Sequence, residues 1–273
     1  MTHKRLDRVQ QNNIHFPAAS LFAWYDKKGR DLPWRRRWPE LAPAYHVWLS
    51  EIMLQQTVVA TVIPYFLEFT RRWPTVNALA AAPLDDVLAA WAGLGYYARA
   101  RNLHKTAAMV AHEWGGEFCC PDSAAFDSEN NWHEHFRALP GIGPYTAGAM
   151  AAIAFGQQAV VVDGNIERIL SRYFGIETPL PSAKTEIAVV YKSLLPVRRP
   201  SDFPQALMDF ANAVCTPKQP GCEGCCLAGS CVALAKGISE KLPVKPAKVE
   251  KPLRRAIFFV ATNQFGEAFL HKR

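Results

Sequence analysis

The stretch LPGIGPYTAGAMAAIAFGQQAVVVDGN, residues 139–165, decides the fold that we expect for this chain. Gly141 and Gly143 stand two residues apart and favour a tight turn. Pro144 follows where a helix can begin, because its φ is preset and its missing N–H costs nothing in a first helical turn. The preceding segment WHEHFRAL can itself form one or two helical turns. The stretch therefore predicts a helix, a hairpin turn and a second helix.

The same stretch combines an anion-binding feature with an acid. A turn that runs into a helix N-terminus presents backbone N–H groups and the positive end of the helix dipole to an anion such as a phosphate. The apolar run over residues 159–162 then leads directly to Asp163. Each feature also has an ordinary explanation: the glycines can form a connecting turn, and Asp163 can cap the helix after it. Together they favour a functional unit.

Composition limits the class of protein. The chain has 273 residues, of which 49% are hydrophobic, enough for one large domain or two modest ones. The net charge of +7 suits a polyanionic partner but is weak evidence alone. No apolar run approaches the roughly 18 to 20 residues of a membrane span, and THKRLDRVQQNN is too polar for a signal peptide. We expect no membrane contact and an intracellular location: the cytoplasm of a bacterium, or the nucleus or mitochondrion of a eukaryote.

Most of the remaining chain has the apolar spacing of helices. In FPQALMDFANAVC, for example, apolar residues from Phe203 to Val214 follow steps of four, three and four. The expected helices cover residues 18–28, 47–69 with a break near Pro64, 74–82, 83–91, 98–114 and 203–214.

SEIMLQQT, residues 50–57, places an acid among apolar neighbours. Glu51 and Gln55 are four residues apart and share one helix face, while Leu49, Ile52 and Met53 make the surroundings apolar. A carboxyl group that loses hydration has a raised pKa, so Glu51 could donate a proton near neutral pH. The alternative is a solvated stripe, with Glu51 and the glutamines on the surface.

Two strings combine aromatic and basic residues. In LPWRRRW, arginines between tryptophans could contact phosphate or stack on a base, although adjacent arginines often form solvated surface. In GLGYYARARN, Tyr96 and Tyr97 offer flat surfaces to a base, and Arg99 and Arg101 offer charge to phosphates. The tyrosine pair could equally serve in packing.

Four of the seven cysteines indicate a metal centre. Cys215, Cys222, Cys225 and Cys231 are separated by six, two and five residues in a segment rich in glycine and proline, so their thiolates could converge. A [4Fe-4S] cluster and zinc are both candidates, although zinc sites more often pair two C-x-x-C units and this segment has one. We interpret Cys226 as a spectator. We expect Cys119 and Cys120 to be free thiols.

These motifs carry a family resemblance. LPGIG with VDGN resembles the helix-hairpin-helix superfamily of DNA glycosylases, and SEIMLQQT, GLGYYARARN and the cysteine spacing resemble its adenine DNA glycosylase (MutY) branch. The resemblance implies an all-α, two-lobed fold. A six-helix domain would cover residues 35–155, and an iron-sulfur domain would combine residues 1–34 and 156–235. It also implies one [4Fe-4S] cluster on the four cysteines.

The resemblance further implies a reaction. The partner would be duplex DNA with adenine opposite 8-oxoguanine or guanine, bound by a monomer. Glu51 would protonate the adenine and Asp163 would stabilise the sugar cation, with Tyr145 and Asn165 in supporting roles. Tyr96, rather than Tyr97, would wedge beside the mispair. The residues implied to contact DNA are Arg35, Gln55, Gln56, Tyr96, Gly141 and Gly143.

Two alternatives remain open. Endonuclease III-like enzymes, which act on oxidised pyrimidines and also cleave the strand, use a lysine amine where this chain has Tyr145, and a phenol cannot form a Schiff base. A non-catalytic iron-sulfur DNA-binding protein would have no use for Glu51 and Asp163 together. Both alternatives therefore explain the residues less completely.

The ends of the resemblance are less specific. Residues 117–132 read as a long inserted loop without an assigned role, and Glu167 stands where some family members carry lysine. Residues 236–256 are rich in lysine and proline, as in a linker. Residues 257–273 read as strand, turn and strand. In the family a domain that recognises 8-oxoguanine begins here, and we expect a shortened start of that domain.

Overall fold

The computed structural model describes residues 16–119, 131–246, 253, 255, 257 and 259–269. Within these residues the secondary structure is helical, apart from one antiparallel bridge between Thr262 and Ala268. The expected all-α fold is therefore confirmed. In the same part of the chain, no helix combines the length and the apolar character needed to cross a bilayer.

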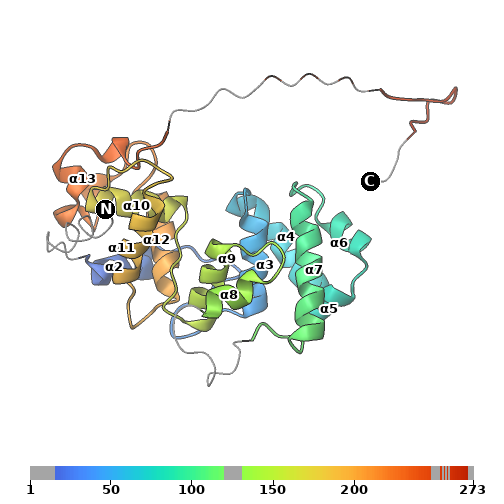
Figure 1. Ribbon diagram of the computed structural model, residues 1–273, viewed down its shortest axis with the longest axis horizontal. Helices are drawn as coiled ribbons and strands as arrows, with labels where there is room; N and C mark the ends of the chain where they lie inside the picture. Colours follow the sequence, from blue (N-terminus) through green and yellow to red (C-terminus); the bar gives the residue numbers. More distant parts are fainter. Residues whose placement is uncertain are drawn as a thin grey trace.

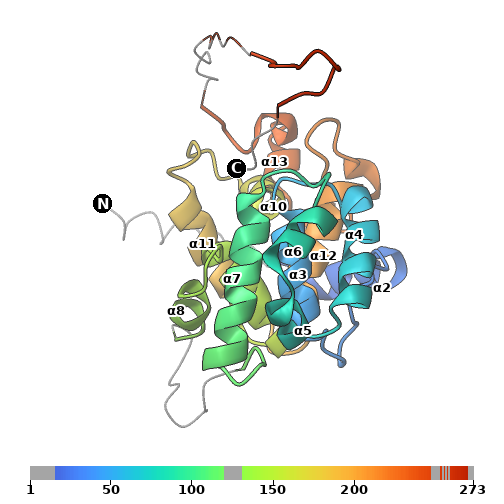
Figure 2. The ribbon, with the colours of Figure 1, turned by 90° about the vertical axis from the view of Figure 1, so that its right-hand side faces the viewer.

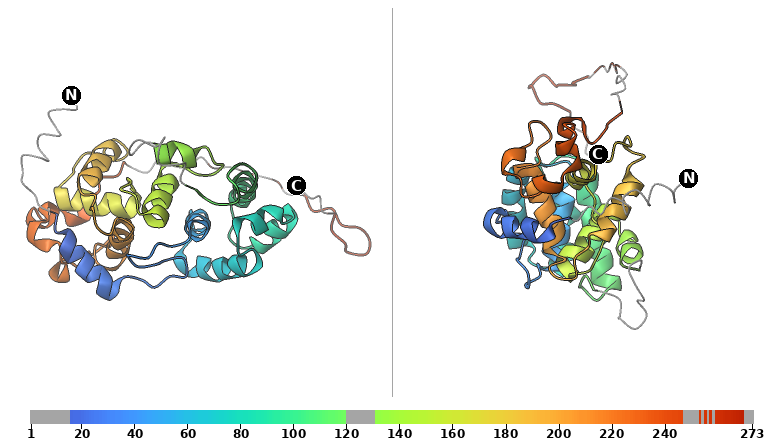
Figure 3. Two further views of the ribbon diagram at one scale, coloured as in Figure 1. Left: turned by 90° about the horizontal axis from the view of Figure 1, so that it is seen from below. Right: turned by 90° about the vertical axis from the view of Figure 1, so that its left-hand side faces the viewer.

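The helices form two groups that lie side by side (Figures 1 and 3). One group contains α2 (Ala18–Lys28), α10 (Gly164–Phe174), α11 (Lys184–Ser193), α12 (Asp202–Ala213) and α13 (Val232–Ala235). The other contains α3 (Ala44–Leu54), α4 (Val59–Arg72), α5 (Val76–Ala81), α6 (Leu84–Ala90), α7 (Ala98–Glu113), α8 (Asn131–Arg137) and α9 (Pro144–Ala149). Helix α2 thus packs against α12, far away in sequence. The boundaries at residues 35, 155 and 235 stay predictions.

A short π-helix, Met150–Ala154, connects the groups. It continues α9 and packs against both α3 and α12. Buried apolar residues of both groups belong to one continuous core, which includes Tyr25 of α2 and Trp91 after α6. Because the groups share a core, side chains from both can be held in fixed positions at their junction.

Helix α4 corrects one expectation. Pro64 lies inside α4 and does not break it. A proline in a helix removes one hydrogen bond, but the face formed by Val62, Phe66 and Phe69 is buried and stabilises the helix through the proline. The real interruption is the turn over residues 55–58, where Gln56 has φ of 58°.

The hairpin between α8 and α9 follows the expectation, with different roles for its two glycines. Gly141 has φ of +79°, a conformation that favours glycine, and a Cβ there would lie 3.1 Å from Asn102 Cβ, a tight contact. Gly143 is extended and has nothing within 4 Å of an added Cβ. Helix α9 begins at Pro144, as predicted. Gly143 therefore leaves open space in front of α9.

The C-terminal residues form a turn with a short paired segment. Asn263 N donates to Glu267 O at 3.0 Å, and Phe269 N donates to Ala261 O at 2.8 Å, so residues 261–269 fold back on themselves in a turn. The described residues there form a single bridge and no strand, so the expected start of a β-containing domain stays a prediction. Residues 120–130, with Cys120 and most of the expected insertion, lie outside the described residues, as do residues 247–252 of the expected linker.

Candidate active site

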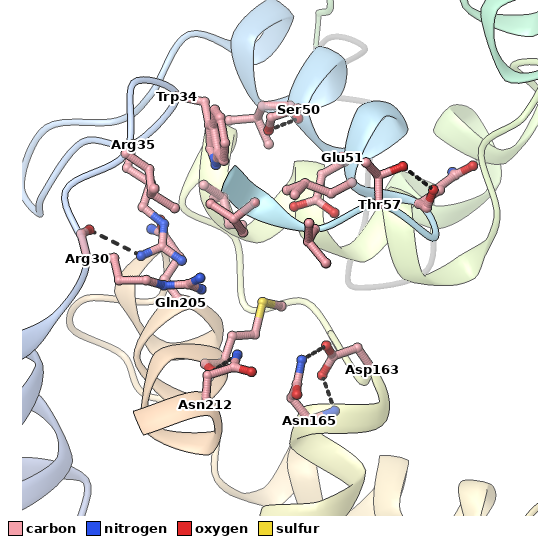
Figure 4. Close-up of a pocket in the computed structure, with 18 of the residues that line it drawn as sticks. Arg30, Trp34, Arg35, Ser50, Glu51, Thr57, Asp163, Asn165, Gln205 and Asn212 are labelled. Atoms are coloured by element: carbon pink, nitrogen blue, oxygen red, sulfur yellow. Dashed lines mark hydrogen bonds between the residues drawn. The ribbon is translucent and has the colours of Figure 1, made fainter. Parts of the chain in front are cut away.

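A cavity of about 580 Å³ lies at the junction of the two helix groups (Figure 4). Glu51 reaches it from α3, Asp163 from the start of α10, and Tyr145 from the first turn of α9. In Figure 4 the two acids approach the cavity from opposite sides. The structure therefore brings together the two acids that the sequence singles out 112 positions apart. The other polar or ionisable side chains on its wall are Arg30, Arg35, Ser50, Gln55, Thr57, Asn165, Gln205 and Asn212.

Glu51 occupies an apolar environment. Helix α3 is buried from Val47 to Met53, and Glu51 itself is only 8% exposed. Burial raises the pKa of Glu51 to about 7; a hydrogen bond from the Tyr145 hydroxyl lowers it, the charge of Asp163 raises it, and Arg35 lowers it. Of the two sequence alternatives for Glu51, a solvated stripe is thus wrong. A large share of Glu51 is protonated at neutral pH.

Asp163 has the opposite environment. Its Oδ1 accepts hydrogen bonds from Asn165 N at 3.0 Å and Ile166 N at 2.8 Å, and its Oδ2 accepts from Asn165 Nδ2 at 2.7 Å. It is the N-cap of α10, where N–H donors and the helix dipole interact favourably with negative charge. The capping role and the place in the cavity coexist. Asn165 binds the carboxylate directly.

The hydroxyl of Tyr145 is affected by the charges of both acids. This hydroxyl donates to Met208 Sδ at 3.9 Å and also interacts with Glu51 through a hydrogen bond that lowers the pKa of that carboxyl. Burial, followed by the charges of Glu51 and Asp163, raises the pKa of Tyr145 well above its usual value. The phenol therefore stays neutral and can act as a hydrogen-bond donor to Glu51.

Arg35 is placed differently from a phosphate-binding arginine. Its Nη1 and Nη2 donate to Asp209 at 2.7 and 3.1 Å, and its side chain is 10% exposed. Arg30 joins the same carboxylate through its backbone N and its Nε, both at 2.7 Å. This buried network supports one wall of the cavity. A direct DNA contact by Arg35 stays a prediction, and the observed bonds favour a structural role.

The three adjacent arginines have three different environments. Arg36 is exposed, and Arg37 donates to Tyr25 O at 2.8 Å while lying over the Tyr25 ring. The sequence alone treats them alike, because only the fold shows which side chain turns inwards.

The predicted DNA-facing residues after α3 lie near the hairpin. Gln55 lines the cavity, with its Nε2 3.5 Å from Gly141 O, whereas Gln56 is exposed. Tyr96 is 63% exposed and Tyr97 is 41% exposed. The hairpin glycines are also exposed. These positions leave the side chains and the hairpin accessible to a large partner, and the contacts themselves stay predictions.

Arg99 corrects a sequence expectation. We expected its charge to be available to phosphates, but the side chain is buried and donates to backbone carbonyls of two loops. Arg101, two residues later on α7, is exposed as expected.

The four cysteines with metal-ligand spacing line one small cavity. Cys215, Cys222, Cys225 and Cys231 all contribute to it, and Cys226 does not. The Arg172 guanidinium donates to Cys215 Sγ at 3.3 Å and to backbone carbonyls of residues 215–217, which holds this loop to α10. Among the described residues, no three His, Cys, Asp or Glu side chains converge as ligands of a single ion. The thiols instead surround a space.

Sequence comparison matches residues 49–192 of the 273 to the HhH-GPD superfamily base excision DNA repair protein family. The chain belongs to this superfamily. The match begins beside Glu51 and includes the hairpin, Tyr145 and Asp163. The HhH-GPD residues thus contain both acids of the cavity.

Curated HhH-GPD relatives are named adenine DNA glycosylase. The Homo sapiens protein is 43% identical over 230 residues, which are 82% of this chain and 40% of the relative. The protein of Buchnera aphidicola subsp. Schizaphis graminum is 38% identical over 262 residues, 95% of this chain and 71% of the relative. The chain therefore spans less than half the length of its human relative.

Solved structures support the fold. A thermostable thymine-DNA glycosylase superimposes with a TM-score of 0.67 at 25% identity, covering 85% of this chain and 99% of that chain. A trapped covalent endonuclease III-DNA intermediate superimposes with a TM-score of 0.63 at 19% identity, covering 87% and 99%. Both agree with the two-group helical HhH-GPD architecture.

The sequence did not reveal Asn212, which lines the cavity, or Asp209, which binds two arginines of the cavity wall in this HhH-GPD chain. Both lie on α12, whose apolar rhythm predicts one buried stripe, yet Asp209 is also buried. A charged residue beside the apolar stripe, combined with the arginine run near residue 35, is the only signal that could have indicated the network. Glu167, also without an expected role, is 8% exposed and lies 3.4 Å from Lys184 Nζ, which ties α10 to α11.

Proposed function

We propose that this HhH-GPD chain is a monofunctional DNA glycosylase that removes adenine opposite 8-oxoguanine or guanine in duplex DNA. One observation carries the proposal: a buried carboxyl with a pKa of about 7, Glu51, and a carboxyl capped by N–H donors, Asp163, line the same cavity. Two acids in contrasting environments are the arrangement that hydrolysis of a glycosidic bond requires. The names of the relatives support adenine as the base.

The cavity suits one extruded nucleoside. Its volume of about 580 Å³ is typical of pockets for small organic ligands. A base stacked in duplex DNA cannot reach Glu51, so the nucleotide must first flip out at a cost of a few kcal/mol, which is smaller for a mispair. Tyr96, Gln55 and Gln56 would hold the opened stack. The backbone N–H groups of the hairpin at Gly141 and Gly143 would hold the DNA strand.

Glu51 would supply the proton. In its neutral form it donates to N7 of the adenine, so the base leaves as a neutral molecule rather than as an anion. The Tyr145 hydroxyl orients the carboxyl by its hydrogen bond. Because the pKa of Glu51 is about 7, both its protonated and ionised forms are accessible at physiological pH.

Asp163 would stabilise the positive charge that develops on the sugar as the bond breaks. Three N–H donors keep its carboxylate in place, so its position needs no rearrangement during the reaction. Water then adds to the sugar and leaves an abasic site. A non-catalytic DNA-binding protein would gain nothing from burying Glu51 beside a second acid, because that burial is unfavourable for stability.

Tyr145 separates this proposal from a bifunctional enzyme. Strand cleavage through a Schiff base needs an amine at the sugar. Among the described residues, none of the side chains that line the cavity is a lysine, and Tyr145 carries a phenol in that position. Borohydride should therefore trap no covalent protein-DNA adduct.

The four cysteines would hold one [4Fe-4S] cluster. Four thiols that line one small cavity fit an iron-sulfur cluster by their chemistry and their spacing of six, two and five residues. Bound there, the cluster would replace apolar core in holding the loop rigid. Arg172, with its bonds to residues 215–217, connects this loop to α10, the helix that Asp163 caps.

A duplex assay tests the proposed function. The protein is incubated with 5′-labelled duplexes that carry adenine opposite 8-oxoguanine, guanine or thymine, and half of each sample is then treated with alkali. We expect cleavage of the adenine strand after alkali, with the two mispairs only, and none without alkali. Intact adenine strands would contradict the assignment. Cleavage without alkali would instead identify the bifunctional enzyme.

A further inference from the structure

One buried arginine holds both loops that carry the proposed stack-opening residues. Arg99 Nη1 donates to Ile52 O at 3.1 Å, to Met53 O at 2.9 Å and to Gln55 O at 2.5 Å, all at the end of α3. Its Nη2 donates to Leu94 O at 2.8 Å and to Gly95 O at 3.4 Å. The two loops are 40 residues apart in sequence and meet at one guanidinium.

The two loops share a conformational feature. Gln56 has φ of 58° and Tyr96 has φ of 47°, so both non-glycine residues occupy the left-handed region, which is unfavourable for a residue with a Cβ. Each directly follows a carbonyl that Arg99 binds, Gln55 O or Gly95 O. Such conformations persist only when surrounding contacts enforce them. Arg99 supplies contacts on both loops at once.

The charge of Arg99 suits this place. In the described part of the chain, the acceptors of Arg99 are backbone carbonyl oxygens and Thr57 Oγ1, at 3.2 Å, and none is a carboxylate. Helix α3 carries no basic residue in its last turn, so Arg99 provides the positive charge that a helix C-terminus favours. It also lies over the Tyr96 ring, 5.6 Å from the ring centroid. Helix α7, which carries it, is itself fixed against α5 and α6 (Figure 2).

We propose that Arg99 is a positioning residue that holds the loops 55–57 and 94–97 together, so that Gln56 and Tyr96 are presented to DNA as one preformed wedge. The proposal rests on the proposed function for the role of the wedge. Because the loops are already ordered before DNA binds, the free energy of DNA binding can be used to open the base stack. Loss of the Arg99 hydrogen bonds should slow base extrusion while leaving proton transfer by Glu51 intact.

Arg99→Lys tests the planar geometry of the guanidinium separately from its positive charge. Lysine keeps the positive charge but has a single donor centre, so it cannot reach both loops as a planar guanidinium does. Arg101→Lys makes the same change at an exposed position on the same helix and is the matched control. Thr57→Ala, which removes one acceptor of Arg99 without disturbing a buried charge, is a second and milder variant.

Hydrogen exchange gives a readout that needs no DNA. Thr57 N donates to Leu54 O at 3.2 Å and Leu94 N donates to Trp91 O at 3.1 Å, so these amides report the order of the two loops. In Arg99→Lys we expect exchange at both amides to be at least tenfold faster, with the other helices unchanged. Thr57→Ala should accelerate exchange around residue 57 by less. Arg101→Lys should match the wild type at both amides.

Single-turnover excision gives the second readout. In Arg99→Lys we expect at least a tenfold lower rate on adenine opposite 8-oxoguanine, and a smaller loss when the adenine lies opposite an abasic site and needs less unstacking. Equal losses on both substrates, or unchanged exchange at both loops, would overturn the proposal. If the wild type excises no adenine, the proposed function fails, while the exchange result still decides whether Arg99 holds the loops.

Discussion

The C-terminal half of α3 and the first turn of α10 contribute one acid each to a single cavity, in opposite surroundings. Glu51 lies on a helix that is buried on nearly all sides, and burial raises its pKa to about 7. Asp163 lies at a helix N-terminus and accepts three hydrogen bonds from N–H groups. The difference in proposed role comes from the surroundings of each carboxyl group, since both groups are carboxylic acids with similar intrinsic properties.

The comparison also shows why the two acids do not simply exchange roles. Glu51 lies inside α3, whereas Asp163 is half-buried and occupies the N-cap position of α10. Their mutual repulsion adds to the difference, since the charge of Asp163 raises the pKa of Glu51 further. The structure thus places one carboxyl group in an apolar helix and the other among N–H donors, as the proposed division of roles requires.

Removing the proton donor should have the largest effect. Glu51→Gln keeps the size of the side chain but cannot donate a proton as an acid, so we expect a loss of excision rate on the order of 10³- to 10⁴-fold. Affinity for the mispaired duplex should change little. Single-turnover kinetics and a gel-shift titration measure the two quantities, and a variant with more than a tenth of the wild-type rate would refute the role of Glu51.

Removing the negative charge should have the next largest effect. Asp163→Asn preserves an N-cap, since asparagine caps helices about as well as aspartate, but it loses the charge opposite the sugar. We expect the excision rate to fall on the order of 10²- to 10³-fold with little change in thermal stability. Asp163→Ala is the control that loses both the helix cap and the negative charge, and it should additionally be destabilised by about 1 kcal/mol. A fully active Asp163→Asn would show that Asp163 is only a helix cap.

The pH dependence of the chemical step should follow Glu51. Its acid form is required and its pKa is about 7, so the rate should be constant at low pH. Above pH 7 it should decrease about tenfold for each pH unit. Single-turnover rates between pH 5 and 9 test this. A rate that rises through pH 7 would contradict a protonated Glu51.

Replacing Tyr145 should change the pH dependence of the excision rate. Its hydrogen bond lowers the pKa of Glu51, so Tyr145→Phe should move the falling limb to higher pH. If the limb stays in place, the hydroxyl does not bind Glu51 in solution. The comparison uses the wild type as its control and needs no absolute rate.

The effect of Glu51→Gln on stability should have the opposite sign to its effect on the excision rate. The pKa of Glu51 is about 4.5 when unfolded and about 7 when folded, so its contribution to stability is fully present below pH 4.5 and is lost as pH rises through 7. Near pH 5 the stability of Glu51→Gln should lie within about 1 kcal/mol of the wild type. At pH 8 the variant should be more stable, by up to about 3 kcal/mol.

Urea unfolding at pH 5 and pH 8 measures this difference. Glu113→Gln, on the exposed end of α7, is a matched control in which the two pH values should give the same small change. A Glu51→Gln variant that is less stable than the wild type at pH 8 would show that Glu51 is not a buried charge there. If Glu51→Gln is more stable than the wild type at pH 8, Glu51 lowers the stability of the folded protein, as functional residues often do.

The sequence predicted helices well where apolar spacing is decisive and less well where contacts from afar decide. Residues 18–28 and the hairpin into Pro144 agree with the structure, because local preferences and burial coincide there. Pro64 was expected to end a helix and does not, because the burial of one face of α4 outweighs the lost hydrogen bond. The break lies instead at residues 55–58, where Arg99 binds the chain from another helix.

The candidate site shows the same division. Glu51, Asp163 and Tyr145 could be found from motifs and from their resemblance to a known family, and the structure places them in one cavity. Asp209, Asn212 and the inward turn of Arg35 could not, because α12 and the segment before α3 are brought together only by the fold. Arg99 and Arg101 are indistinguishable in sequence, yet one is buried and the other exposed.

The sequence by itself determined the elements and the chemical groups: a glycine-proline hairpin, an acid within an apolar helix, an acid at a helix start, and four suitably spaced cysteines. Only the tertiary structure decided that the two acids share one cavity and that Arg99 holds two strained loops. Helix starts and turns depend on neighbouring residues and can be recognised locally. Protonation and loop position depend on burial and on charges from distant segments, which exist only once the chain has folded.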